Sequence, residues 1–178
     1  MRRLISWLAF CLTGLLLVST TACKKKHPAG AFKATDDGVL ATMVHVADPR
    51  SAPQLIKGFY PIENRAWRWT QSNFSVSLRP PLTGAKNGAR LVLKFVIPGV
   101  VLDKLHSIKL SSKVNGFDLP PEEYTRAGEQ TYSRDVPPIA LPLTAVNVDF
   151  TLDKFLPPSP ADNRELGVIV SAVGFEAK

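Results

Sequence analysis

The sequence predicts an all-β protein, an antiparallel β-sandwich of about eight short strands in one domain at residues 38–178. Apolar and polar residues alternate with a period of two in several segments, which is typical of strands with one face on a core and one in water. The 15 prolines, eight of them in adjacent pairs, separate these segments. No segment of the domain shows the apolar period of a long helix.

The first 22 residues have the features of a secretory signal peptide. Arg2 and Arg3 precede an uncharged, mostly apolar stretch at residues 4–18, and small residues follow at 19–22. A membrane-spanning helix needs roughly 20 apolar residues, so this shorter stretch favours a cleaved leader over a protein anchor.

The end of the leader, Thr21-Ala22-Cys23, resembles the lipobox of bacterial lipoproteins, with Thr20 where that family usually has Leu. The resemblance implies that Cys23 is lipidated and becomes the mature N-terminus. Cleavage by ordinary signal peptidase, which leaves a free thiol, is the alternative. By the same resemblance, Lys24 favours an anchor in the outer membrane of the cell envelope, facing the periplasm or the cell surface. Cys11 lies in the leader, so the domain has no disulfide and its core must stabilise it alone.

Residues 23–37 contain the lipidated cysteine and a polar, basic tether. Its three consecutive lysines, at 24–26, favour anionic lipid headgroups, and a solvated spacer fits them equally well. The chain carries a net charge of +7, but residues 38–178 contain 16 Lys+Arg against 13 Asp+Glu, a net charge of only +3. The domain therefore lacks the strongly basic composition of nucleic-acid-binding proteins, and we expect no nucleic-acid partner.

Each predicted strand follows from its own pattern of apolar residues. Less regular apolar segments predict strands near residues 40–46, 55–60, 66–70 and 131–136, and strict alternation predicts strands at 74–78, 91–97 and 146–152. Ile108 and Leu110 lead into Asn115-Gly116, a pair that tolerates positive φ and so predicts a type I′ hairpin. The continuous apolar run at 168–170 is typical of a central strand.

Proline pairs mark the loops and the strand edges, because proline cannot donate a hydrogen bond to a sheet. The pairs lie at residues 80–81, 120–121, 137–138 and 157–158. The one helix candidate follows such a pair, from Pro121 to Arg126, and is a single turn at most.

Two segments resemble a jelly-roll domain of bacterial envelope and sugar-related proteins, which is often appended to glycosyltransferases or methyltransferases. The first is Gly58-Phe59-Tyr60-Pro61, then Glu63 and Trp67-Arg68-Trp69-Thr70. The second matches an Asp-x-Arg-x-Leu-Gly pattern with Asp162, Arg164, Leu166 and Gly167. The turn at Asn115-Gly116 also suits galactose-binding-like sandwiches. The resemblance implies a jelly-roll fold and an accessory binding module, here without the catalytic domain of its relatives.

The candidate ligand-binding residues are Tyr60, Glu63, Trp67, Arg68, Trp69, Asp162 and Arg164. Trp67 and Trp69 share one face of a strand. They form either a platform for a sugar ring, with Tyr60 or Phe59 beside it, or part of the core, and the core is favoured.

Arg68 points away from both tryptophans and has two interpretations of its own. It pairs with Glu63, or with Asp162 and Glu165, in a structural ion pair, or it lines a polar pocket with Glu63 and Arg164. The structural ion pair is favoured.

Catalytic patterns are missing from the domain. His45 and His106 lie in no metal-binding pattern, and no G-x-S-x-G motif occurs. We therefore expect no enzyme activity, no metal and no cofactor. The leading hypothesis is a non-catalytic envelope lipoprotein that binds a ligand, with carbohydrate as the candidate. The second is a structural or assembly protein that contacts another envelope protein, and an envelope hydrolase comes last.

Overall fold

The computed structural model describes residues 40–178. The leader, Cys23 and the tether lie outside these residues, so the expectations for them stay predictions. Within the described part of the chain, no helix is both long enough and apolar enough to cross a membrane.

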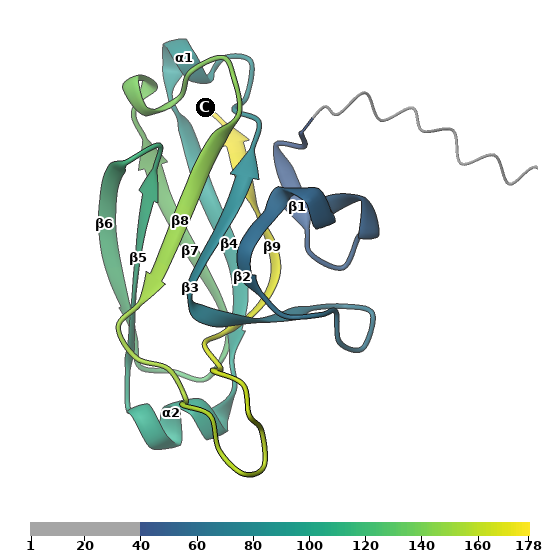
Figure 1. Ribbon diagram of the computed structural model, residues 1–178. Coiled ribbons are helices and arrows are strands. Elements are labelled where there is room, and N and C mark those ends of the chain that lie inside the picture. Colours follow the sequence, from purple (N-terminus) through teal and green to yellow (C-terminus); the bar gives the residue numbers. More distant parts are fainter. Residues whose placement is uncertain (1–39) are drawn as a thin grey trace, which may run out of the picture. The chain divides into compact units, whose positions relative to one another are not determined.

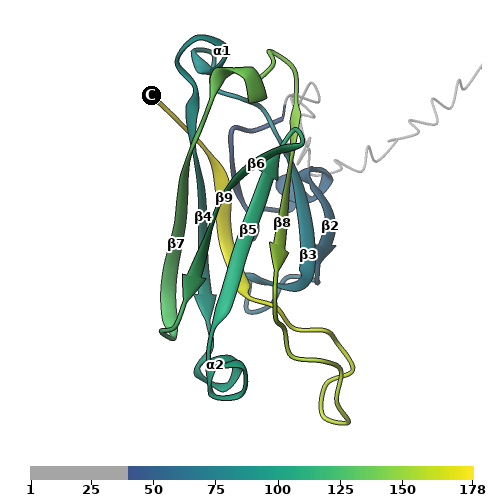
Figure 2. The same ribbon diagram turned by 90° about the vertical axis from the view of Figure 1, so that its left-hand side faces the viewer.

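The described residues fold into an antiparallel β-sandwich with nine strands in two layers (Figures 1 and 2). The first layer, sheet A, has the order β1 (Met43–His45), β9 (Ile169–Ala177), β4 (Ala89–Ile97) and β7 (Gly128–Val136). The second layer, sheet B, has the order β2 (Leu55–Phe59), β3 (Arg68–Leu78), β8 (Val146–Leu152), β5 (Ile108–Val114) and β6 (Phe117–Tyr124). Without β2, which extends one edge, this is the strand order of an eight-stranded jelly roll. The predicted fold class is confirmed.

Strand β3 belongs to both layers. Its first two residues, Arg68 and Trp69, pair with β9 of sheet A, and its residues 73–78 pair with β8 of sheet B. The two strands predicted at 66–70 and 74–78 are therefore parts of one long strand that passes from one layer to the other.

Short helices close the two ends of the sandwich. Helix α1 (Gly84–Asn87) and the 3₁₀ turn η2 (Pro138–Ala140) lie at the end that also holds the C-terminus, and α2 (Gly99–Leu105) lies at the opposite end (Figure 1). A further 3₁₀ turn, η1 (Pro49–Gln54), precedes β2.

The helix predicted from Pro121 to Arg126 is wrong, because most of this segment belongs to β6. This strand pairs only with β5, so Pro120 and Pro121 lie in an edge strand. On the open side of that strand, a proline without an N–H group loses no hydrogen bond to a neighbouring strand. The sequence missed α2, whose two adjacent valines, Val100 and Val101, are poor helix formers.

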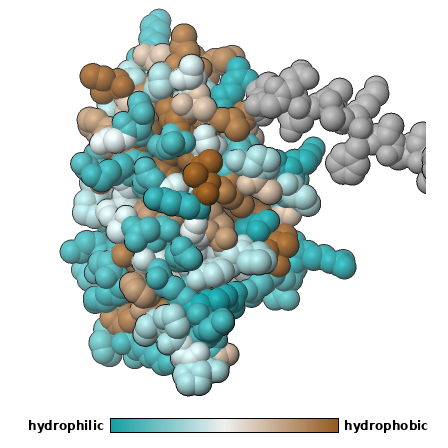
Figure 3. Space-filling view, in the orientation of Figure 1, coloured by the Kyte–Doolittle hydropathy of each residue, from teal (hydrophilic) through white to brown (hydrophobic). Residues whose placement is uncertain are grey.

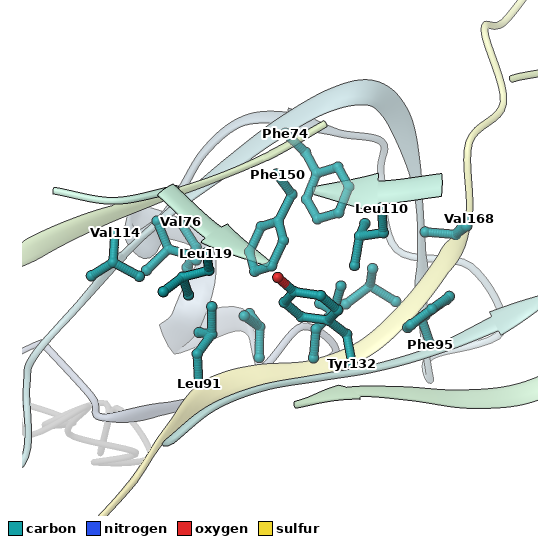
Figure 4. Close-up of a cluster of buried hydrophobic side chains, with 14 of the residues drawn as sticks. Phe74, Val76, Leu91, Phe95, Leu110, Val114, Leu119, Tyr132, Phe150 and Val168 are labelled. Atoms are coloured by element: carbon teal, nitrogen blue, oxygen red, sulfur yellow. The ribbon is translucent and has the colours of Figure 1, made fainter. Parts of the chain in front are cut away.

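The core lies between the sheets and contains the alternating residues that the sequence singled out (Figure 4). Phe74 of β3 and Phe150 of β8 stack with ring centroids 4.9 Å apart. Tyr132 reaches toward Phe150 from sheet A, with its ring centroid 6.5 Å away in an edge-on arrangement. The fully buried residues from the predicted alternation include Val76, Leu78, Leu91, Leu93, Ile97, Leu110 and Val148.

The predicted hairpin between β5 and β6 is confirmed. Asn115 and Gly116 have φ values of 49° and 82°, and Val114 pairs with Phe117 across them. Positive φ at both central residues is the geometry of a type I′ turn, whose twist matches the twist of the flanking strands.

Candidate functional site

A tight turn places Trp67 immediately before β3. Glu63 and Trp67 exchange backbone hydrogen bonds, with N–O distances of 2.9 and 3.3 Å. Between them, Asn64 and Arg65 have φ values of 49° and 56°, so the chain reverses through the left-handed region. Asn is among the residues that tolerate this region best, which explains locally why the chain turns here.

The side chain of Arg68 holds the start of β3 by donating to main-chain carbonyls of two neighbouring segments. Its Nε donates to the carbonyl of Val46 at 2.8 Å, and its Nη1 donates to the carbonyl of Tyr60 at 3.0 Å. These bonds connect β3 to the segment after β1 and to the end of β2.

The ion pair predicted for Arg68 is wrong. Of the carboxylates proposed for it, Glu63 and Asp162 bind Arg164, and Glu165 accepts a hydrogen bond from the backbone of Ser72. Arg68 instead has two main-chain acceptors within reach, because the residues that follow β1 and β2, Val46 and Tyr60, bring their carbonyls to the start of β3.

A cleft of about 460 Å³ lies beside Trp67 on the outer face of sheet A, and we call it the Trp67 cleft. Its apolar lining includes Val96 of β4 and Ile169 of β9, which face each other across the two strands. Its polar lining comes from neighbouring strands and consists of Lys94, Glu129, Gln130, Thr131 and Ser171. Lys94 pairs with Thr131 and Val96 with Glu129, so strand register brings these polar groups together.

A bulge in β9 shapes one wall of the Trp67 cleft. Lys94 is opposite Ala172, whereas Phe95 is opposite Val170, so Ser171 is an extra residue without a partner across the strand pair. The Ser171 hydroxyl donates to the Lys94 carbonyl at 3.2 Å, and its own carbonyl accepts from the Val46 amide at 3.1 Å. Bulges redirect side chains and are common beside functional sites, and here the bulge directs Ser171 into the lining.

The two tryptophans differ in their surroundings although they are two residues apart. Trp69 packs against the hydrophobic core, as the core interpretation expected. Trp67 lines the Trp67 cleft and is half-buried. Its indole Nε1 is buried and has no hydrogen-bond partner among residues 40–178. A buried donor of this kind costs stability.

Four of the predicted site residues meet elsewhere, around the guanidinium of Arg164. We call this group (Tyr60, Glu63, Asp162 and Arg164) the Arg164 cluster. Arg164 Nη1 lies 2.6 Å from Glu63 Oε1, and its Nε and Nη2 donate to the carboxylate of Asp162 at 3.0 and 2.9 Å. The guanidinium carbon lies 5.2 Å from the centroid of the Tyr60 ring.

The Arg164 cluster connects two loops, the turn before β3 and the long loop between β8 and β9. Hydrogen bonds from Arg164 hold the pKa of the Asp162 carboxyl below its usual range, and the two carboxylates raise the pKa of Arg164. Because the protein's own carboxylates occupy the guanidinium, this arrangement favours loop fixation over ligand capture. A smaller cavity of about 210 Å³ adjoins the cluster, with Lys104 of α2 on its wall.

The structure thus brings only Trp67, of the seven predicted site residues, to the larger cleft. The sequence missed Lys94, Thr131 and Ser171 as site residues. Lys94 was visible as a polar member of an alternating segment, but which polar residues meet at the cleft depends on strand order and on the bulge. In residues 40–178, no group of three or more His, Cys, Asp or Glu side chains is placed to hold a metal ion.

No protein family model matches the chain, and no curated protein matches it. Several solved structures have a similar fold. One is the CBM36-1 domain of a multidomain xylanase from the hindgut metagenome of Trinervitermes trinervoides, at 8% identity and a TM-score of 0.43, covering 77% of this chain and 97% of that one.

Two further similar structures belong to larger proteins, of which this chain spans about a third. An acetyl xylan esterase, Est2A, from Butyrivibrio proteoclasticus has 11% identity and a TM-score of 0.45, with 79% of this chain and 34% of that chain covered. The CBM51-2 and INT domains of Clostridium perfringens ZmpB, in complex with GlcNAc, have 13% identity and a TM-score of 0.37, with 77% and 28% covered. At these identities and TM-scores, the likenesses assign neither a family nor a ligand to this chain.

Proposed function

We propose that this protein is a non-catalytic binding protein and that the Trp67 cleft takes a carbohydrate. The observation that carries the proposal is the combination of a half-buried indole, an apolar floor at Val96 and Ile169, and polar groups around them. A sugar ring has a matching surface, with C–H groups on its faces and hydroxyls at its edges. Ligand sites in proteins commonly combine an apolar lining with a few convergent polar groups in this way.

The polar lining supplies both donors and acceptors for sugar hydroxyls. Lys94 donates, Glu129 accepts, and Thr131 does either.

The test is a titration of the protein with cell-wall and surface glycans, in which tryptophan fluorescence and calorimetry measure binding. We expect a glycan of this panel to bind. We expect Trp67→Ala to raise the Kd by about tenfold or more, as truncation of a central aromatic in a binding site does. Lys94→Met and Thr131→Val should weaken binding less.

Trp69→Phe is the matched control, because Trp69 packs against the core rather than lining the cleft. It should leave the Kd within about twofold, since a conservative core substitution leaves the ligand contacts in place. An unresponsive panel, or a Trp67→Ala protein that binds as the wild type does, would contradict the proposal.

The proposal includes the location of the protein in a bacterial cell envelope, anchored by lipid on Cys23. The support is the order of a positive leader, a short apolar stretch and Ala22-Cys23. Mass spectrometry of the mature N-terminal peptide decides between the alternatives: a diacylglyceryl-modified Cys23 supports the anchor, and an unmodified thiol contradicts it. The link to modules appended to glycosyltransferases or methyltransferases stays a prediction.

A further inference from the structure

Three aliphatic side chains project into solvent at the end of the sandwich that holds α1 and η2. Leu82 is 84% exposed, Ile139 is 85% exposed and Leu143 is 81% exposed, and we call these three residues the apolar tip. Hydrophobic side chains project from this end in the space-filling view (Figure 3). Single exposed apolar residues are common, but three large ones on adjoining loops form an unusual surface.

The two loops that present the apolar tip pack against each other. Gly84 lies against Pro80, Pro81 and Leu141, and Gly88 lies against Pro138. Leu82 belongs to the first loop, and the other two members of the tip flank Leu141 in the second. Prolines restrict the backbone of both loops, and the contacts between the loops hold the tip at this end.

The described chain begins at the same end. The amide of Arg79 donates to the carbonyl of Ala41 at 3.2 Å, and the amide of Phe175 donates to the carbonyl of Thr42 at 2.9 Å. Arg79 is only three residues before Leu82, so the segment that leads back to Cys23 joins the sandwich beside the apolar tip.

The length of the segment at 24–39 limits how far this end lies from the lipid on Cys23. Sixteen residues reach at most roughly 55 Å when they are fully extended. Strand β3, with 11 residues, spans roughly 35 Å of the sandwich. The end with the apolar tip is the end to which a lipid on Cys23 is linked through these 16 residues, whereas the α2 end lies the length of the sandwich away from that junction.

We infer that the apolar tip inserts into the lipid bilayer that holds the Cys23 anchor, and so orients the sandwich on the membrane. Arg79 and Lys86 are exposed beside the tip and suit anionic headgroups, as the lysines at 24–26 do. Exposed aliphatic side chains flanked by cations are typical of surfaces that enter the interface between headgroups and acyl chains. This inference rests on the anchor in the proposed function and is independent of the carbohydrate.

The test uses the full mature protein reconstituted in phosphatidylethanolamine and phosphatidylglycerol vesicles that contain a nitroxide-labelled lipid. Single cysteines replace Leu82 or Leu143 and carry an environment-sensitive fluorophore. The matched control is Val100→Cys in α2, which replaces an aliphatic residue that is 54% exposed at the opposite end. All three sites are exposed, so these substitutions spare the core.

We expect a blue shift and quenching by the nitroxide at positions 82 and 143, and neither effect at position 100. Equal signals at all three positions, or no quenching at the tip, would overturn the inference. A blue shift that appears without vesicles and grows with protein concentration would also overturn it, because a second copy would then cover the tip.

Two further measurements keep the outcome clear. Wild-type protein without an added cysteine should take up no fluorophore, because its only mature thiol carries the lipid; labelling there would show that the anchor has failed. Hydrogen exchange on the unlabelled wild type should show protection of residues 80–88 and 137–143 in vesicles, and unchanged exchange there would count against insertion.

Discussion

Tyr132 connects the two sheets through one buried hydroxyl. The residue is fully buried in β7 of sheet A, and its hydroxyl donates to the Pro120 carbonyl of β6 at 2.9 Å. The hydroxyl of Ser112 in β5 lies 2.9 Å from the Tyr132 hydroxyl oxygen. It donates to this oxygen, because the tyrosine proton is already donated to Pro120. Both partners belong to sheet B, so one side chain positions two strands of the facing layer.

Replacement of Tyr132 by Phe should destabilise the protein by about 1–3 kcal/mol, because it leaves the buried Ser112 hydroxyl without its acceptor. The Pro120 carbonyl keeps a partner, since Arg134 Nε also donates to it at 2.7 Å. Urea denaturation measures the free energy of unfolding. Adding Ser112→Ala to Tyr132→Phe should cost less than the two single substitutions combined, because the double variant leaves no orphaned hydroxyl.

Ser111→Ala is the control for this pair. Ser111 is the neighbour of Ser112, and its hydroxyl makes an exposed bond of 3.3 Å to the Thr151 carbonyl. Its loss should change the free energy of unfolding by less than about 0.5 kcal/mol. A Tyr132→Phe protein as stable as Ser111→Ala would show that the buried hydroxyl contributes nothing to the junction of the sheets.

Two glycines at element boundaries allow the effect of backbone strain to be measured without a steric clash of the added Cβ. Gly116 has a φ of +82° in the hairpin between β5 and β6, and Gly99, the first residue of α2, lies outside the left-handed region. An added Cβ meets nothing within 4 Å at either position. Gly116→Ala should therefore cost about 1 kcal/mol through backbone strain. Gly99→Ala should stabilise by about 0.5 kcal/mol, because alanine has fewer unfolded conformations to lose. Equal effects in thermal unfolding would mean that φ is not the cause.

Helices, strands and turns were predictable where their cause lies in the local sequence. Segments such as 74–78 and 146–152 form strands because alternation is a local pattern that burial enforces, and Asn115-Gly116 forms a turn because φ is a local property. The segment after Pro120 was predicted wrongly, because proline is tolerated in a strand only at a sheet edge, and edge position is not a local property of the sequence.

The candidate site was less predictable than the strands, because it depends on strand order. The Trp67 cleft combines β4, β7 and β9, which are far apart in sequence, and its Ser171 wall depends on a one-residue bulge. Arg68 and Arg164 illustrate the same limit. The sequence made Arg68 the candidate for an ion pair and Arg164 a candidate for the lining of a polar pocket. Only the folded arrangement of loops decides that Arg164 reaches the carboxylates while Arg68 reaches carbonyls.

At the scale of the whole molecule, the two ends of the sandwich have different surfaces. The end with α1 and η2 presents the apolar tip, and the long loop fixed by the Arg164 cluster lies at the α2 end (Figure 1). Together with the Trp67 cleft on the outer face of sheet A, this arrangement leaves the proposed sugar site unobstructed when the tip rests on a membrane. The core between the sheets must hold the arrangement without a disulfide, since both cysteines precede residue 40.

The buried tyrosines of this core set an alkaline limit to its stability. Burial raises the pKa of Tyr132 above its usual value of 10, and burial, followed by the nearby Glu122 carboxylate, raises the pKa of Tyr124. In the unfolded chain both tyrosines ionise near pH 10, whereas in the folded protein they keep their protons to higher pH. Their contribution to stability is therefore complete below about pH 10 and is lost as the pH rises through the folded-state values.

Thermal unfolding followed between pH 7 and pH 12 should thus show a melting temperature that falls above about pH 10. Tyr132→Phe should start from a lower melting temperature at pH 7, because it leaves Ser112 unpaired, and should then fall less steeply, because one of the two titrating groups is gone. Tyr60→Phe is the control, since Tyr60 is half-buried and lies outside the core; it should keep the wild-type slope. A Tyr132→Phe protein that loses stability above pH 10 as steeply as the wild type would assign the alkaline limit to other groups and leave Tyr132 with its hydrogen bonds alone.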